Sequence, residues 1–157
     1  MKAYLPFGDW SNDGHGRCHR LLVEINSMED VSLAQDKIRK EYGEYFFYDF
    51  ADDYCDDSLS YECWKALFDH GIKDVFPAAM VSDEFESWKE IEERVESPED
   101  EYNNFSVSLE FVEQAFIWLL NKFGAHIELL QEDQKIPEIN GYNCKGFQNV
   151  GYGCFYG

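Results

Sequence analysis

Residues 107–131, VSLEFVEQAFIWLLNKFGAHIELLQ, contain the pattern that decides the fold. Apolar residues recur there every three or four positions, which predicts a helix over about 107–123 that Gly124 ends. One face of this helix is expected to be buried, and it consists of Leu109, Val112, Phe116, Leu119, Leu120 and Phe123. Because it is the least polar helix of the chain, we expect it at the centre of the core. A strand, His126–Gln131, is predicted to follow directly.

A strand followed by a helix is predicted nearer the N-terminus. Arg20–Ile25 alternates between polar and apolar residues, as a half-buried strand does. Ser27 is a good N-cap, Asp30 stands at the reciprocal position of a capping box, and Gly43 ends the helix. The apolar stripe of that helix is Val31, Ala34, Ile38 and Tyr42. Residues 5–19, with Gly among Asp, Asn and Ser, are predicted to form a loop.

The middle of the chain predicts two more amphipathic helices, one from Ser58 or Ser60 to His70 and one over about 83–96. Val75–Val81, entered through Pro77, is predicted to be extended. The tail after residue 141 is rich in Gly and aromatic residues and predicts one or two final strands. The 157 residues fit one domain. We therefore predict a single α+β domain over residues 1–157, with about four helices packed on a small, mostly antiparallel sheet.

Glu44–Asp57, EYFFYDFADDYCDD, combines six acidic residues and six aromatic rings with no Lys or Arg. Its secondary structure is ambiguous. Phe46–Phe50 could be a strand, whereas the spacing of Asp49, Asp52, Asp53 and Asp56 would form one face of a helix. A second acidic stretch, Asp83–Glu101, holds ten acidic residues against two basic ones.

The chain has 32 acidic and 13 basic residues, for a net charge of −19. This charge repels nucleic acid and anionic membranes, and it exceeds what solubility requires. Basic proteins, cations or a nucleic-acid-binding surface are the favoured partners. The N-terminus lacks the pattern of a signal peptide, so we expect a cytoplasmic protein. Its five cysteines, irregularly spaced, are then expected to be reduced thiols.

The acidic stretches form the first candidate site. Residues i and i+4 of a helix lie about 6 Å apart along the axis. Successive phosphates of one DNA strand lie about 7 Å apart in space. A single helix face that carries Asp49, Asp53 and Asp56, or Glu86, Glu90 and Glu93, can therefore present carboxylates at phosphate-like intervals. Interspersed tyrosines can anchor an interface. The predicted partner-binding residues are Asp49, Asp52, Asp53, Asp56, Asp57, Tyr48, Tyr54, Glu86, Glu90 and Glu93. The alternative is a solvated acidic surface that binds nothing.

A second candidate is the segment from Asp9 to His19, a possible metal or catalytic site of a small enzyme or metal-binding protein. Its residues of ligand type are Asp9, Asp13, His15, Cys18 and His19. The alternative is a Gly-rich turn whose carboxylates bond backbone amides. Calcium binding at Asp49–Asp57 is disfavoured because the EF-hand pattern is absent. His70, at a helix C-terminus, is expected to be structural, and His126, at the start of an apolar strand, is expected to be packed and not catalytic.

No phosphate-binding loop or nucleophile elbow is present, so we predict no catalytic residue, metal or cofactor. In composition alone, the chain resembles phage or mobile-element proteins that mimic DNA, and bacterial immunity proteins that block nuclease toxins. That resemblance implies an anti-defence or immunity role in which the acidic protein occupies a basic active site or nucleic-acid channel. We therefore predict an acidic, non-enzymatic inhibitor of a basic, nucleic-acid-handling partner, such as a nuclease or effector complex.

Overall fold

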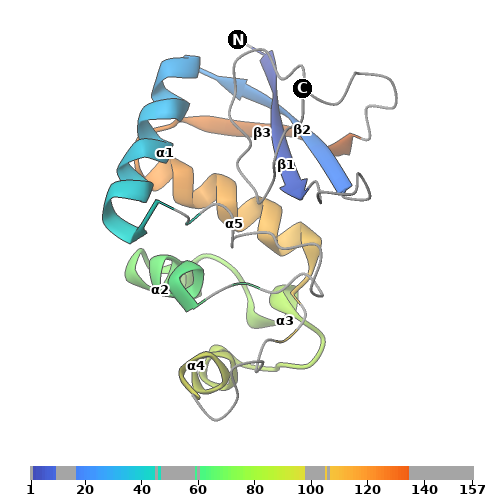
Figure 1. Cartoon of the computed structure of the whole chain (residues 1–157). Helices are drawn as coiled ribbons and strands as arrows, with labels where there is room; N and C mark the ends of the chain where they lie inside the picture. The colour runs from blue at the N-terminus through green and yellow to red at the C-terminus, as the bar shows by residue number, and fades with distance from the viewer. Residues whose placement is uncertain are drawn as a thin grey trace.

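The computed structural model describes residues 2–9, 17–44, 46, 59, 61–97, 105 and 107–134. Their order along the chain is β1 (Lys2–Asp9), β2 (Arg17–Ile25), α1 (Met28–Tyr42), α2 (Tyr61–Asp69), the 3-10 turn η2 (Ile72–Asp74), α3 (Ala78–Val81), α4 (Trp88–Glu96), α5 (Leu109–Lys122) and β3 (Ile127–Gln134). The predicted α+β class is confirmed. The sheet lies at one end of the molecule, α5 lies beneath it, α1 runs down the left side, and α2, α3 and α4 follow further away (Figure 1).

The sheet has the order β1-β2-β3, with both pairings antiparallel. The predicted loop over 5–19 is wrong at both ends, because β1 continues to Asp9 and β2 begins at Arg17. Pro6 and Gly8 suggested a turn, but Pro6 lies in an outer strand, where a missing backbone N–H is tolerated. The pairing of Leu5 with Leu21, far apart in sequence, is a non-local contact that local turn propensity does not report.

β3 is longer than its partner segment of β2. Val23 pairs with Leu129 and Leu22 pairs with Gln131, so Leu130 is an extra residue on β3 and forms a β-bulge. A further irregularity separates the pairs Leu22–Gln131 and Arg20–Gln134. The strand predicted over His126–Gln131 is therefore confirmed, with a later start and a later end.

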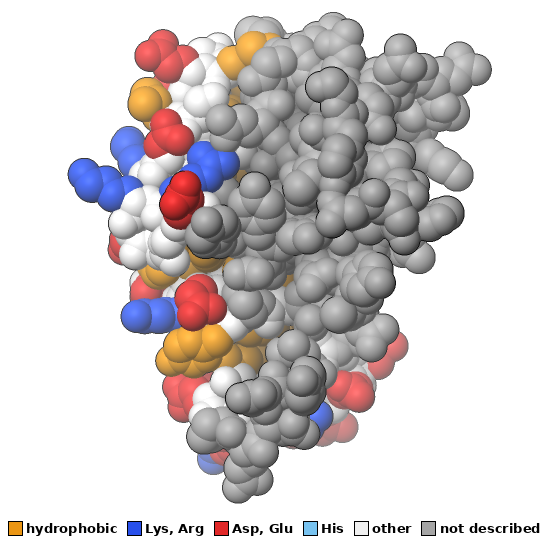
Figure 2. Space-filling model, viewed as in Figure 1, with side chains coloured by type: hydrophobic (Ala, Val, Ile, Leu, Met, Phe, Trp, Pro, Cys, Tyr) orange, Lys and Arg blue, Asp and Glu red, His pale blue; other side chains and the backbone are white. Residues whose placement is uncertain are grey.

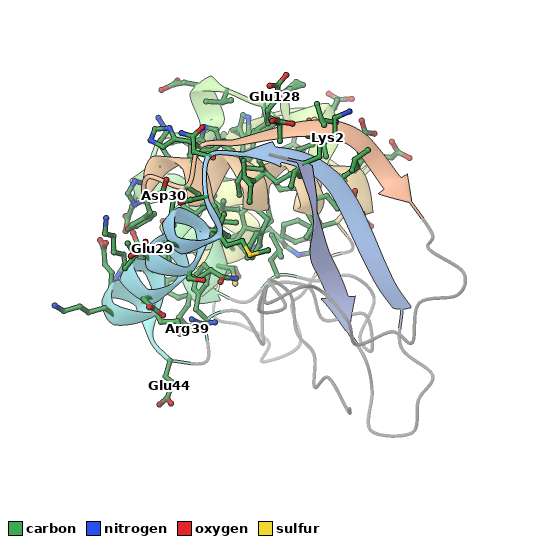
Figure 3. The ribbon with its side chains drawn as sticks, turned by 90° about the horizontal axis from the view of Figure 1, so that it is seen from above. Lys2, Glu29, Asp30, Arg39, Glu44 and Glu128 are labelled. Atoms are coloured by element: carbon green, nitrogen blue, oxygen red, sulfur yellow. The ribbon has the colours of Figure 1, made fainter. Side chains whose placement is uncertain are left out.

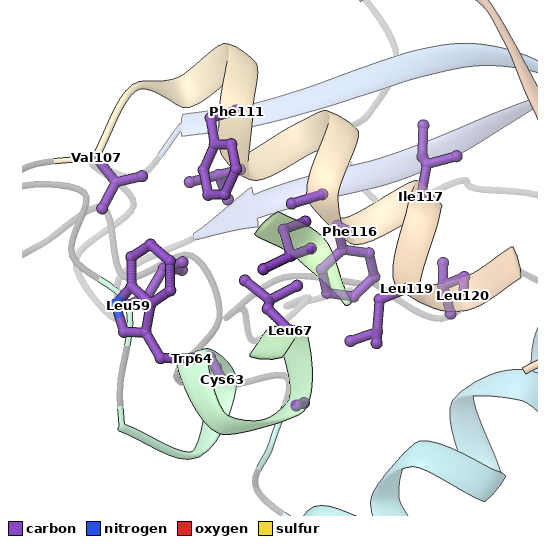
Figure 4. Packing of buried hydrophobic residues seen from close by; sticks show 14 of the residues in the cluster. Leu59, Cys63, Trp64, Leu67, Val107, Phe111, Phe116, Ile117, Leu119 and Leu120 are labelled. Atoms are coloured by element: carbon purple, nitrogen blue, oxygen red, sulfur yellow. The ribbon is translucent and has the colours of Figure 1, made fainter. Parts of the chain in front are cut away.

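α5 is the central helix, as predicted, and contacts α1, α2, α3 and β3. Ser108 caps it, because its Oγ accepts the Phe111 N–H over 3.1 Å. The predicted stripe is buried except for Phe123, which is half-buried, and Leu109, whose side chain lies outside the description. Burial extends well beyond that stripe, to Phe111, Ala115 and Ile117. Figure 4 shows Phe111 and Phe116 of α5 in the cluster that also holds Trp64 and Leu67 of α2.

α1 has the predicted bounds and the predicted caps. The Ser27 Oγ accepts the Asp30 N–H over 3.1 Å, and the helix ends at Gly43, whose N–H donates to Arg39. Val31, Ala34 and Ile38 are fully buried, so the predicted stripe faces the core. α2 likewise matches the predicted helix, with Gly71 in a left-handed conformation after it.

Two predictions between α2 and α5 are wrong. Residues 72–81, expected to include an extended piece from Val75, form η2 and the short helix α3, with Pro77 as the N-cap of α3. Proline has a φ that suits a helix start, so Pro77 begins a helical turn here. The next helix begins at Trp88 instead of Asp83, because Ser87 provides the N-cap.

Candidate acidic interaction surface

Of the second acidic stretch, Asp83–Glu101, the structure describes residues 83–97, and we call residues 83–96 the α4 acidic segment. It holds seven acidic residues and two basic ones. It lies at the end of the molecule opposite the sheet (Figure 1), and Figure 2 shows acidic side chains at that lower end. The side chains that are exposed to solvent are Asp83, Glu84, Glu86, Glu90, Glu93 and Glu96, whereas Glu92 is half-buried.

The apolar side of α4 attaches it to the rest of the protein. Ile91 is fully buried, and Phe85, just before the helix, is nearly so. The Trp88 indole donates its Nε1–H to the Phe76 carbonyl oxygen over 2.8 Å. The same indole lies edge-on to Trp64 and Phe68 of α2, with ring centroids 6.5 and 6.2 Å apart. α4 is therefore fixed through one face, which leaves its acidic faces to solvent.

Lys73 of η2 adds an electrostatic attachment. Its Nζ forms a salt bridge with the Glu92 carboxylate and lies 5.9 Å from the centre of the Phe68 ring. Both partners of the salt bridge are partly exposed, so its contribution to stability is small. Lys73 lies on η2 and Glu92 on α4, so the two residues are far apart in sequence. Local sequence spacing does not indicate such a pair, which is why Lys73 was not predicted as a site residue.

Glu90 forms hydrogen bonds at the start of α4, and the partner-binding role predicted for it stays untested. Its Oε2 accepts the Glu86 N–H over 3.3 Å, and its own N–H donates to the Ser87 Oγ over 3.4 Å. This is a close relative of the capping box, and the Ser87-x-x-Glu90 spacing in the sequence could have revealed it. Glu86 precedes the helix, so the predicted single helical ridge of Glu86, Glu90 and Glu93 is wrong. Only Glu90 and Glu93 lie on α4.

The other acidic stretch, Glu44–Asp57, lies almost wholly outside the described residues. Glu44 is exposed directly after α1, and Phe46 is buried. The remaining predicted partner-binding residues all lie outside the description: Asp49, Asp52, Asp53, Asp56, Asp57, Tyr48 and Tyr54. Phe46, within this stretch, and Leu59, just after it, are each 3% exposed, so buried residues join the core on both sides of residues 47–58.

Cys63 contacts the first of these buried residues. It is buried and reduced, and its thiol donates to the Phe46 carbonyl oxygen over 3.8 Å. The prediction that the chain's cysteines are reduced therefore stays untested for the others, whose side chains lie outside the description.

The predicted metal or catalytic segment falls partly on the sheet. Asp9 ends β1, while Cys18 and His19 lie on β2, where they pair with Gly8 and Phe7. Asp13 and His15 lie outside the described residues. Among the residues that the structure describes, no group of three or more His, Cys, Asp or Glu side chains could hold a metal ion.

Charged residues also form a row across the sheet. Glu24 on β2 pairs with Lys2 of β1 on one side and with Glu128 of β3 on the other. Figure 3, which looks onto the sheet from above, shows Lys2 and Glu128 near one another. The row includes a lysine beside its carboxylates and is therefore less acidic than the α4 acidic segment.

The surroundings of His126 differ from the prediction, whereas His70 lies where it was predicted. His126 was expected to be packed, but it is exposed and has a φ of 56°, because it forms the turn between α5 and β3. His70 follows α2, as predicted, and its ring lies 5.0 Å from the Phe123 ring and 6.4 Å from the Tyr42 ring. The C-terminal ends of α1, α2 and α5 therefore meet around His70.

The hydroxyl of Tyr42 donates to Oδ2 of Asp69 over 3.0 Å at this meeting point. Burial, and then the hydrogen bond to the Asp69 carboxylate, raise the pKa of Tyr42 well above its ordinary value. The bond links the last residue of α1 to the last residue of α2.

Searches against protein-family models, curated proteins and solved structures find no match for this chain. Within the described residues, no helix has the length and the apolar character that a membrane span requires.

Proposed function

We propose that this protein is an acidic binding protein that occupies the basic surface of a nucleic-acid-handling partner and inhibits it. Such a protein acts in the cytoplasm, where its partner handles nucleic acid. The observation that carries the proposal is the α4 acidic segment, whose carboxylates are exposed at one end of the molecule while α4 itself is anchored from behind.

The anchoring supports the proposal because a charged surface binds best when it is ordered before the encounter. Trp88 and Ile91 fix α4 through the core, so binding need not order the helix backbone. Glu86, Glu93 and Glu96 are exposed and can face a partner. A surface of like charges steers a basic partner toward it and raises the association rate.

The test uses immobilised protein as bait for basic proteins in a cell lysate, at low and at high salt. The altered bait carries Glu86→Gln, Glu93→Gln and Glu96→Gln, which keep the size of the side chains. The control bait carries Glu29→Gln, Glu41→Gln and Glu128→Gln, which remove the same charge from exposed sites on α1 and β3. Glu90 is left intact because it stabilises the start of α4.

The proposal predicts a protein that the wild-type and control baits retain, that the altered bait retains weakly, and that duplex DNA or RNA displaces. Its association rate with the wild type should fall steeply as salt rises, and less steeply with the altered bait. A separate bait with Asp52→Asn, Asp53→Asn and Asp56→Asn tests the other acidic stretch. Equal retention by all four baits would contradict the proposal.

A further inference from the structure

Lys73 places a positive charge between an aromatic ring and a carboxylate. Its Nζ lies 5.9 Å from the centre of the Phe68 ring of α2 and forms a salt bridge with the Glu92 carboxylate of α4. The Trp88 indole, one helical turn before Glu92, lies edge-on to the Phe68 ring, with the two ring centroids 6.2 Å apart. Residues of α2 and α4 therefore form a small surface site in which the chain's own ammonium group is the cation.

The Phe68 ring and the Glu92 carboxylate also suit a cation from another molecule. The face of an aromatic ring attracts a cation within about 6 Å of its centroid, and a carboxylate adds a charge-assisted hydrogen bond. A guanidinium group suits this pair better than an ammonium group, because it is planar, stacks on aromatic rings, is more weakly hydrated and binds a carboxylate through two N–H groups. The chemistry of the site therefore favours an arginine side chain.

The contact that Lys73 makes is open to exchange. The Lys73 side chain is 43% exposed and that of Glu92 is 33% exposed, so solvent reaches both partners. An exposed pair of this kind contributes little to stability. The chain nevertheless holds Lys73 beside the site, which gives its ammonium group a high effective concentration against a competitor in solution. Glu96, exposed one turn beyond Glu92, adds negative charge that attracts such a competitor.

We propose that Phe68 and Glu92, flanked by Trp88, form a binding site for an arginine side chain of the basic partner, and that Lys73 occupies this site until the arginine displaces it. The inference rests on the proposed function, because it names the side chain through which the basic partner is recognised. It differs from general attraction to an acidic surface, since it requires an aromatic ring beside the carboxylate and makes one particular lysine a competitor of the partner.

The experiment needs no partner. N-acetyl-arginine amide is titrated into the protein at low salt, and NMR follows the ring signals of Phe68 and Trp88. Lys73→Met removes the competing ammonium group and keeps a long, flexible side chain. Lys89→Met is the matched control, since Lys89 is exposed on α4 and its replacement changes the net charge by the same amount. A double variant, Lys73→Met with Glu92→Gln, tests the carboxylate.

Lys73→Met should bind the arginine probe about fivefold more tightly than the wild type, the gain expected when an exposed salt bridge no longer competes. Lys89→Met should bind the probe as the wild type does, and the double variant should lose the gain. Equal affinities for Lys73→Met and Lys89→Met would overturn the proposal, because net charge alone would then explain binding. Probe binding that leaves the signals of Phe68 and Trp88 unchanged would overturn it as well.

The probe experiment and the lysate experiment fail independently. If Lys73→Met gains affinity for the arginine probe but no bait retains a basic protein, the proposed function is wrong and the cation site stands. If the baits retain a partner as expected but the probe does not distinguish Lys73→Met from Lys89→Met, the proposed function stands and the arginine site is wrong.

Discussion

The indole nitrogen of Trp88 donates a hydrogen bond to the backbone carbonyl oxygen of Phe76 over 2.8 Å, and this bond joins α4 to the segment that follows η2. Trp88 is half-buried, and its ring also lies against Trp64 and Phe111. A single side chain thus provides both a polar and an apolar attachment for the acidic helix.

Trp88→Phe should lower the free energy of unfolding by about 1–3 kcal/mol, because the Phe76 carbonyl loses its donor and the smaller ring fills less space. Trp118→Phe is the matched control: Trp118 is also half-buried, and the described residues offer its indole N–H no hydrogen bond. Urea denaturation measures both variants. A loss at Trp118 as large as that at Trp88 would show that the hydrogen bond contributes little.

Leu119→Ala should lower the free energy of unfolding by about 2–5 kcal/mol, since Leu119 is fully buried at the centre of the core and its removal leaves a cavity. Leu33→Ala makes the same change on α1 at a side chain that is 47% exposed, so it should cost little. The two variants are compared by urea denaturation. A loss below about 1 kcal/mol at Leu119 would mean that α5 is not the central helix.

Glu90→Ala should lower the free energy of unfolding by about 0.5–1 kcal/mol, because the Glu86 N–H loses its acceptor at the start of α4. Glu93→Ala removes the same charge from an exposed site later on the same helix and should be close to neutral. Thermal unfolding at low salt compares the two. Equal losses at both positions would assign the effect to charge and helix propensity instead of the cap.

Tyr42→Phe should change the stability of the protein in alkali. A tyrosine of the unfolded chain ionises near pH ~10, whereas burial and then Asp69 raise the pKa of Tyr42 in the folded protein. Unfolding therefore releases a proton at high pH, and the stability that Tyr42 contributes is lost as the pH rises above about 10. The decline should be shallower in Tyr42→Phe than in the wild type.

The control for Tyr42 is Tyr61→Phe, which removes the hydroxyl of a tyrosine that is 57% exposed. Urea denaturation at several alkaline pH values measures the slope for each protein. If the slope of Tyr42→Phe equals that of the wild type, the hydrogen bond between Tyr42 and Asp69 does not persist in solution.

Local signals in the sequence predicted the helices that are capped by their own residues. Ser27 and Gly43 mark the two ends of α1, and Gly124 follows the end of α5. Such positions can be predicted because a cap is a contact between neighbours in sequence. β1 was missed because its partner lies in another segment and its Pro and Gly resemble a turn. The start of α4 was misplaced because Phe85 continues the apolar stripe although it precedes the N-cap.

The sequence predicted which segment is acidic, but it did not predict which contacts each carboxylate makes. Charge counts identify the α4 acidic segment, yet they cannot separate Glu90, which caps the helix, from Glu93, which faces solvent. The pairing of Lys73 with Glu92 depends on how η2 packs against α4. Tertiary contacts of this kind follow from the fold and not from the spacing of charges.

Among the strands that the structure describes, β1 and β3 are the two outer ones, and each carries an irregularity. β3 carries the extra residue Leu130, which bends the strand and breaks the regular spacing of its N–H and C=O groups. β1 contains Pro6, which has no backbone N–H and cannot donate a hydrogen bond. A second chain that tried to extend this sheet would find an interrupted ladder on either side, so both borders disfavour the edge-to-edge stacking through which β-sheets aggregate.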